Sequence, residues 1–345
     1  MTTPLFDTLV FVGRFQPFHN SHLQTVSQAL ALARTMVIVI GSDKRPRTPK
    51  NPFSTQERRL MIEAALMEHH PGDLARIRFV AVRDYFDGPR WARAVFQAVQ
   101  AVVADDKARV GLIGHAKDHS TTYLDDFPDW QRVPLENIGG LNATDIRQQW
   151  YSQCIETEAA MPAAVVKIMQ KFRQRPEFVE LKTEHAYLES YRESWKHAPY
   201  PPTFVTVDAL VQCQNSVLLI QRGGFPGRGQ WATPGGFLDP HERIINAAWR
   251  ELQEETGLVL NSQSADVKLV AQAYFDHPER SARGRTITHV FHFDLGNRPL
   301  PEIKAADDAM TAQWVPIAAL PAMESNVFED HFVVLEHFLG LKRID

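Results

Sequence analysis

The chain has 345 residues, a hydrophobic content of 44%, a charged content of 23% and a formal net charge of −4. This length exceeds that of one average domain, so we expect two domains that each bury a core. The small negative charge argues against a general nucleic-acid binder, and no apolar stretch is long enough to span a bilayer.

The two cysteines, Cys154 and Cys213, match no metal-ligand spacing and suggest no disulfide framework. They are typical of structural thiols in a reducing cytosol. The first apolar run is interrupted by Asp7 and Arg14, which is not the pattern of a signal peptide. We therefore expect a cytoplasmic protein that binds neither membrane nor nucleic acid, with homo-oligomerisation left open.

Short apolar runs alternate with helical patterns in the first half of the chain. The expected strands are 8–12, 36–40, 78–82 and 109–113, and the expected helices are 21–34, 55–68 and 90–103. Continuous Val/Ile strands in this rhythm predict an α/β fold with a doubly wound parallel sheet covered on both faces. Such sheets bind ligands at the carboxyl ends of their strands.

The second half has a different texture. Helical patterns at 162–173 and 181–196 lead to a proline-rich break at 199–202, which we take as the domain boundary. The strands expected beyond it are 204–212, 217–221, 267–274 and 286–295. They predict an α+β sandwich on a mixed sheet.

The segment 13–22 (GRFQPFHNSH) follows the first strand and opens the first helix. Backbone amides at a helix N-terminus attract phosphate, and His19 and His22 could both face that anion with Arg14 nearby. A lone histidine is more often structural, but this strand-turn-helix context favours a site. The segment resembles the His-X-Gly-His signature of nucleotidylyltransferases, with Ser21 in place of the glycine.

Further segments narrow this resemblance to the nicotinamide mononucleotide (NMN) adenylyltransferases over residues 5–180. They are 41–44 (GSDK), 51–54 (NPFS), 57–58 (ER), 114–118 (GHAKD), 127–130 (FPDW) and 142–147 (NATDIR). The implied reaction joins ATP and NMN to give NAD and pyrophosphate. Its attacking phosphate oxygen is already ionised at neutral pH, so catalysis needs alignment and charge stabilisation rather than a strong base.

The resemblance implies that His19, His22 and Arg147 carry this catalysis, with Mg²⁺ bridging the phosphates. Residues implied to support nucleotide binding are Gly13, Arg14, Phe15 and Thr144, with substrate contacts from Lys117 and Asp118. Trp91 could stack on the nicotinamide ring, and a core tryptophan is an equal alternative.

The segment 236–258 carries an acidic helix. Glu251, Glu254 and Glu255 share one helical face, because residues three and four apart are neighbours. Such crowded carboxylates repel one another unless cations neutralise them, and oxygen ligands favour Mg²⁺ or Mn²⁺. The alternative is a solvated acidic face, which does not explain the glycines at 235–236 or the Arg250-Glu251 pair.

Two other features of this segment indicate a docked helix. An apolar stripe of Ile245, Ala248 and Leu252 adjoins the acidic face. Gly257 supplies a residue that can end the helix in a left-handed conformation.

The spacing of this segment resembles the Nudix box at every defining position. The resemblance implies metal-dependent hydrolysis of a nucleoside diphosphate linked to another group. It makes Glu251 and Glu255 metal ligands, makes Glu254 a further ligand or part of the base system, and brings the backbone of Gly235 and Gly236 near the metal.

Other segments resemble Nudix members that hydrolyse ADP-ribose, namely 276–280 (DHPER), 283–286 (RGRT) and 307–309 with 314–316. Arg283 and Arg285 could clamp phosphate, and Asp307 or Asp308 could supply a distal base. A basic solvated turn and an ordinary loop are equally good interpretations of these residues. Together the halves resemble the bacterial bifunctional adenylyltransferase–Nudix proteins, which predicts domains at 1–180 and 203–345 joined by a linker at 181–202.

Three alternatives stay open at this point. The first keeps both folds but changes the substrates, with another adenylyl acceptor in front and NADH or a sugar nucleotide behind. The second makes the Nudix half a ligand-sensing regulatory domain, although the box is intact. The third, motivated by Ser21, leaves one half active and the other degenerate.

Overall fold

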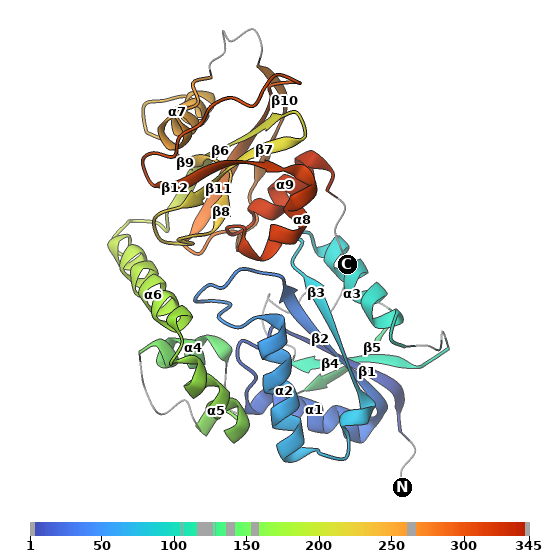
Figure 1. Cartoon of the computed structure of the whole chain (residues 1–345). Coiled ribbons are helices and arrows are strands. Elements are labelled where there is room, and N and C mark those ends of the chain that lie inside the picture. The colour runs from blue at the N-terminus through green and yellow to red at the C-terminus, as the bar shows by residue number, and fades with distance from the viewer. Residues whose placement is uncertain are drawn as a thin grey trace. The chain divides into compact units, whose positions relative to one another are not determined.

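The computed structural model describes residues 4–103, 105, 107–115, 127, 129–135, 142–152, 159–260 and 267–341. The chain divides into two compact units, residues 1–182 and 183–345, and the division falls within helix α6 (Pro176–Ser194). Each unit has its own sheet (Figure 1). Across the described ranges, every helix is too short or too polar to cross a bilayer.

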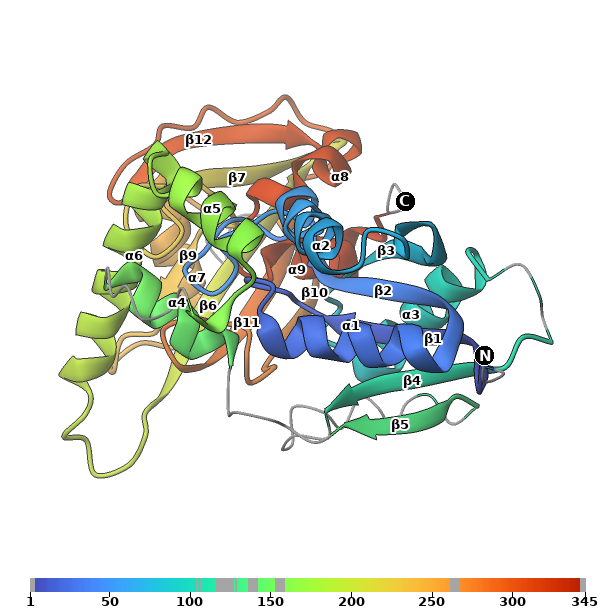
Figure 2. The ribbon, with the colours of Figure 1, turned by 90° about the horizontal axis from the view of Figure 1, so that it is seen from below.

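The first unit is built on a parallel sheet with the strand order β3-β2-β1-β4-β5, which can be followed in Figure 2. Its strands are β1 (Phe6–Gly13), β2 (Ala33–Asp43), β3 (Ile77–Arg83), β4 (Val110–His115) and β5 (Gln131–Leu135). Its helices are α1 (Asn20–Leu32), α2 (Thr55–His69), η1 (Leu74–Arg76), α3 (Gly88–Gln100), α4 (Ala143–Tyr151), α5 (Ala163–Phe172) and the start of α6. The predicted doubly wound parallel sheet is confirmed, and its order reverses beside β1, where such folds bind ligands.

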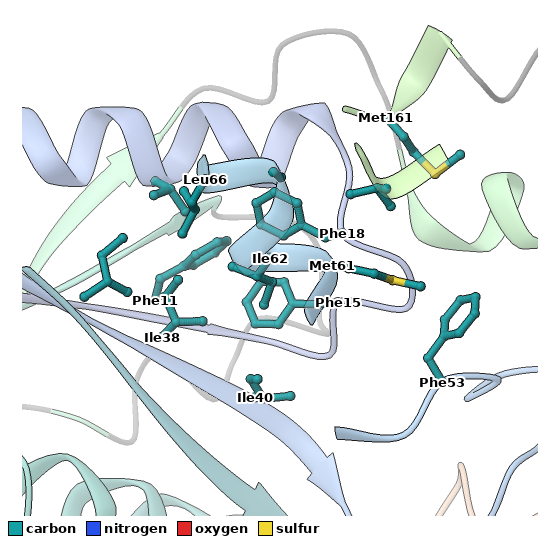
Figure 3. Packing of buried hydrophobic residues seen from close by; sticks show 14 of the residues in the cluster. Phe11, Phe15, Phe18, Ile38, Ile40, Phe53, Met61, Ile62, Leu66 and Met161 are labelled. Atoms are coloured by element: carbon teal, nitrogen blue, oxygen red, sulfur yellow. The ribbon is translucent and has the colours of Figure 1, made fainter. Parts of the chain in front are cut away.

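Each face of this sheet has a separate apolar cluster. On one face, side chains of β1 and β2 pack against α1 and α2, and Figure 3 shows Phe15 and Phe18 among Met61 and Ile62 of α2. On the other face, the alternate residues of the same strands pack against α3. Because both faces are covered, the central strands β1 and β2 carry continuous apolar runs, as the sequence predicts.

Two details of the first unit differ from the expectation. The first helix was expected to reach residue 34, but β2 begins at Ala33, whose backbone is extended. Thr35 is drawn into the sheet by its register with Thr8 and by a 2.8 Å hydrogen bond between the two hydroxyls. The edge strand β5 was not expected, because its sequence has no apolar run.

The second unit has a mixed sheet with the order β10-β11-β6-β7-β12, to which β8 and β9 add at β7 and β6. Its strands are β6 (Thr203–Cys213), β7 (Ser216–Arg222), β8 (Trp231–Ala232), β9 (Gly235–Phe237), β10 (Lys268–Phe275), β11 (Arg285–Asp294) and β12 (Ala309–Pro316). Its helices are α7 (Ile244–Thr256), η4 (Ile317–Ala319), α8 (Leu320–Met323), η5 (Glu324–Asn326) and α9 (His331–Leu339). The predicted α+β sandwich is confirmed, while β8, β9 and β12 were not foreseen.

Helix α7 covers one face of this sheet and α9 the other. The α7 side buries Ala248 and Leu252 against alternate residues of β6 and β11. The α9 side buries Leu335 against the opposite residues of β6 and β7. Gly257 ends α7 with a φ of 68°, the left-handed residue that the sequence predicts.

Candidate active sites

The turn after β1 is held by a buried arginine. Arg58 of α2 is 1% exposed, and its guanidinium donates to the carbonyl oxygens of Arg14 (2.8 Å), Gly41 (2.5 Å) and Ser42 (3.1 Å). Burial lowers the pKa of Arg58 to about 10. These bonds tie together the carboxyl ends of β1 and β2, a role that the sequence analysis did not assign to this residue.

The two predicted histidines lie together at the start of α1. The His19 N–H donates to Nδ1 of His22 (3.3 Å), and the two rings stack with their centroids 3.6 Å apart. The His22 ring is bordered by Phe11, Phe15 and Phe18, with centroids 5.0 to 5.9 Å away. Both imidazoles are therefore fixed where the helix N-terminus favours an anion.

Arg147 of α4 reaches the same turn. Its guanidinium donates to the carbonyl oxygen of Gln16 (2.7 Å) and to Oγ1 of Thr144 (3.2 Å). Burial, and then repulsion by Arg14, lowers the pKa of Arg147 to about 10. A side chain this basic stays protonated at neutral pH, so the turn gathers positive charge that suits phosphate.

The other predicted residues of the first unit differ in how they are packed. An ideal Cβ on Gly13 would lie 2.7 Å from the Phe15 ring, so that glycine lets the buried ring fold back onto β1. Ser21 is 5% exposed and fits within the first turn of α1. The Trp91 ring meets Phe127 edge-on at 6.1 Å in the α3 cluster, the packing expected of a core tryptophan.

Lys117 and Asp118 lie outside the described residues.

In the second unit, Arg250 connects the acidic helix to the loop before it. It donates to both carboxylate oxygens of Glu242 (2.7 and 3.2 Å), to Glu251 (2.8 Å), to Glu254 (2.9 Å) and to the carbonyl of Phe237 (3.1 Å). These partners, led by Glu242, raise the pKa of Arg250. The number of residues that separate the glycine loop, Glu242 and the Arg250-Glu251 pair in the sequence therefore brings all of them within hydrogen-bond reach of the Arg250 guanidinium.

The glycine loop lies directly against two of the glutamates. Gly235 donates its N–H to Oε2 of Glu255 (2.9 Å). An ideal Cβ on Gly236 would lie 2.6 Å from Oε2 of Glu251, so only a glycine leaves room for that carboxylate. The structure therefore brings together the loop, Glu251 and Glu255, while Glu254 is the outer member, with 45% of its side chain exposed.

Burial raises the pKa of Glu251, against the effect of Arg250. Burial raises the pKa of Glu255 well above its ordinary value, and the neighbouring Asp308 carboxylate raises it further. Asp308 precedes β12, so a residue expected from sequence to be near the site is brought to Glu255 by the sheet. Three carboxyl groups therefore share a small region.

These residues fit a divalent cation in their chemistry. No three acidic, histidine or cysteine side chains within the described ranges already converge as a metal site, and Glu251 and Glu254 share Arg250 instead. The available donors are hard carboxylate oxygens, which suit Mg²⁺ or Mn²⁺. Burial, and after it the neighbouring carboxylates, raise the pKa of Glu251 and of Glu255, and a bound cation would favour the ionised form of both.

The arginines predicted as a clamp have different settings. The guanidinium carbon of Arg283 lies 4.9 Å from the ring centroid of Phe237, beside the glycine loop. Arg285 donates to the carbonyl oxygen of Asp276 at the turn before β11. Arg280 forms a buried two-bond ion pair with Asp330 (2.8 and 2.9 Å).

A buried polar network behind Gly235 was missed by the sequence analysis. Asp208 of β6 accepts from Oγ1 of Thr233 (3.1 Å), and Nδ1 of His331 accepts from the Thr233 N–H (3.2 Å). Burial lowers the pKa of His331, which favours the neutral ring. An ideal Cβ on Gly235 would lie 2.7 Å from Oδ1 of Asp208, so this network packs directly under the glycine loop.

Comparison with known proteins assigns a family to each unit. Residues 10–149 match the Cytidylyltransferase-like family, and residues 202–338 match the NUDIX domain family. The nicotinamide/nicotinic acid mononucleotide adenylyltransferase of Acinetobacter baylyi is 39% identical over 52% of this chain and 94% of its own length. The ADP-ribose pyrophosphatase of Methanocaldococcus jannaschii is 33% identical over 44% of this chain and 82% of its own length.

One similar protein spans both units. The bifunctional NMN adenylyltransferase/ADP-ribose pyrophosphatase of Francisella tularensis is 35% identical, covers 97% of this chain and 99% of its own, and superposes with a TM-score of 0.92. A second crystal structure of that protein, with AMP and manganese, has a TM-score of 0.90 at 33% identity and the same coverage of both chains. Because this match runs through both sites and nearly the full length, the chain belongs to the family of bifunctional NMN adenylyltransferase/ADP-ribose pyrophosphatases.

Proposed function

We propose that this chain makes NAD with one half and hydrolyses ADP-ribose with the other. Residues 1–180 would form the adenylyltransferase domain, residues 203–345 the Nudix domain, and residues 181–202 the connection. The proposal rests on the two sites that the structure assembles. In the first unit His19 and His22 stack beside Arg147, and in the second unit Glu251 and Glu255 lie against the glycine loop.

In the first reaction, a phosphate oxygen of NMN attacks the α-phosphorus of ATP, and pyrophosphate leaves. The nucleophile is already ionised, so the residues need only align the two phosphates and stabilise the developing charge. We assign this to His19 and His22 at the helix N-terminus and to the guanidinium of Arg147. Arg14, Thr144, Gly13 and Phe15 would shape the nucleotide site, with Lys117, Asp118 and Trp91 as candidates for contacts to the acceptor.

In the second reaction, water attacks one phosphorus of the ADP-ribose diphosphate to give AMP and ribose 5-phosphate. A divalent cation supplies Lewis-acid polarisation of the phosphate when it is bound. Glu251, Glu254 and Glu255 would hold it with the backbone of Gly235, and Glu254 or Asp308 would accept the proton from water. Arg283, beside the glycine loop, would contact the diphosphate. Arg285 would stabilise the turn that positions Arg283.

We propose Mg²⁺ as the working ion, with Mn²⁺ as a substitute. The oxygen-only donor set supports a hard cation, and the manganese in the Francisella structure supports a divalent one. Activity lost in EDTA and restored by Mg²⁺ at millimolar concentration would support this choice. Restoration by Mn²⁺ alone would contradict it.

The test of the function is a product analysis of the full chain. ATP with NMN should yield NAD and pyrophosphate, and ADP-ribose with Mg²⁺ should yield AMP and ribose 5-phosphate. Nicotinic acid mononucleotide, NADH and a sugar nucleotide serve as competing substrates. Glu255→Gln should abolish hydrolysis and leave adenylyl transfer intact. Equal turnover of unrelated diphosphates would contradict a dedicated ADP-ribose site.

A further inference from the structure

Arg222, the last residue of β7, lies on the α7 face of the second sheet. Alternate residues of a strand point to the same face, and Leu218 of β7 packs in the α7 cluster with Leu252. Arg222 therefore points to the side of the sheet that carries the acidic helix. Its backbone pairs with Ala309, and the next N–H, of Gly223, donates to the carbonyl of Asp308 (2.7 Å).

The side chain of Arg222 is held in place, but not all of its hydrogen-bond donors are used. Its Nε donates to the carbonyl oxygen of Pro226 (3.0 Å), and its guanidinium carbon lies 4.3 Å from the ring centroid of Phe328. Among the residues that the structure describes, no hydrogen bond is made by either terminal nitrogen of Arg222. The planar group is thus anchored by one edge and one face, with its terminal fork available.

The surroundings of Arg222 are strongly charged. Burial, and then repulsion by Arg283, lowers the pKa of Arg222, whereas Glu329, Asp308 and Glu255 oppose that decrease. A guanidinium that served only to neutralise these carboxylates would be expected to hydrogen-bond one of them, and Arg222 does not. The arrangement leaves two arginines close to each other beside the carboxylates that fit a metal.

We propose that Arg222 binds the diphosphate of the Nudix substrate through its two terminal nitrogens, together with Arg283. The two terminal nitrogens of a guanidinium can each donate to one phosphate oxygen. The positive charge of the guanidinium also balances part of the negative diphosphate charge that a bound cation does not neutralise. Anchoring by Pro226 and Phe328 fixes the fork before the substrate arrives, which limits the entropy lost on binding. This inference rests on the proposed hydrolase function.

The test compares Arg222→Gln and Arg222→Lys with Arg228→Gln, an exposed arginine of the loop that follows β7, all in the full chain. Two readouts are needed: kcat/KM for ADP-ribose with Mg²⁺, and calorimetric binding of ADP-ribose in EDTA. Both Arg222 variants should lose about 10- to 100-fold in each, the loss expected for a charge-assisted pair of hydrogen bonds. Arg228→Gln should stay within twofold, and adenylyl transfer should be unchanged throughout.

The lysine variant separates binding from charge balance. If Arg222→Lys behaves as wild type, the residue only neutralises carboxylates and the inference is wrong. It also keeps the buried charge, so it remains informative if Arg222→Gln does not fold. A wild-type chain that binds ADP-ribose without cleaving it would contradict the hydrolase function, and the binding comparison would still decide the role of Arg222. A wild-type chain that does not bind ADP-ribose would refute both.

Discussion

Substitution of Gly236 by alanine should inactivate the hydrolase without unfolding it. The ideal Cβ of an alanine there would lie 2.5 Å from Cδ and 2.6 Å from Oε2 of Glu251. The obstacle is the end of a side chain, so Glu251 can turn away and the backbone need not move. To reach ordinary contact the carboxylate must shift by roughly 1 Å, and a misplacement of that size costs on the order of 100-fold in rate.

Gly235 offers the contrasting substitution. An alanine Cβ there would lie 2.9 Å from Cα of Asp208 and would also collide with the carbonyl oxygen of Val207, both part of the β6 backbone. A strand cannot give way as a side chain can, so Gly235→Ala should lower the free energy of unfolding by about 1–3 kcal/mol or more. Substitution of the two neighbouring glycines should therefore have different effects: Gly236→Ala should lower catalysis, and Gly235→Ala should lower stability.

The assay measures AMP release from ADP-ribose, thermal melting, and NAD synthesis as an internal control in the same chain. Gly236→Ala should lose roughly 100-fold in kcat/KM at an unchanged melting temperature. Combined with Glu251→Gln, it should add little to the loss from Glu251→Gln alone, because both act through one carboxylate. The reasoning is refuted if Gly236→Ala hydrolyses ADP-ribose within threefold of wild type, or if the two losses multiply.

Three further predictions test other parts of the molecule. His19→Ala should reduce NAD synthesis, measured by pyrophosphate release, by at least about 100-fold while hydrolysis persists; near-normal synthesis would sink its assignment. Because the raised pKa of Glu255 makes the native state bind more protons, metal-free stability should fall as pH rises above 4.5. Glu255→Gln should reduce this dependence of the melting temperature on pH between pH 5 and 8. An unaltered dependence would show that another group causes it. Asp330→Ala leaves Arg280 buried and unpaired, so urea unfolding should show a loss of about 3–5 kcal/mol; a loss below 1 kcal/mol would contradict a buried pair.

The fold was predictable wherever a segment's local pattern agrees with its tertiary setting. The central strands β1 and β2 are buried on both faces, so their continuous Val/Ile runs predict them directly from the sequence. Strand β12 could not be found this way, because all its side chains except the buried Val315 alternate irregularly between partial burial and exposure. It exists because it pairs with β7 along its length, which is a property of the assembled sheet and not of residues 309–316.

The same distinction separates the site residues that the sequence reveals from those that it hides. Glu251, Glu255 and Gly257 stand within two turns of one helix, so their spacing in sequence is their spacing in space. Arg222 ends β7 and Asp308 immediately precedes β12, so the two residues meet only because these strands pair. Nothing in the run before Arg222 distinguishes it from an ordinary charged strand end.

The second site combines features that lower the stability of the ligand-free fold. Glu255 is 2% exposed and shares its surroundings with Asp308, while Arg222 is desolvated beside Arg283. A sequence selected for stability alone would place apolar side chains there, because buried ionised groups are expensive without full pairing. A cation at the carboxylates and a diphosphate at the arginines would relieve both costs at once. Metal and substrate should therefore stabilise the unit jointly by more than the sum of their separate effects, since each supplies charge that the other's partners lack.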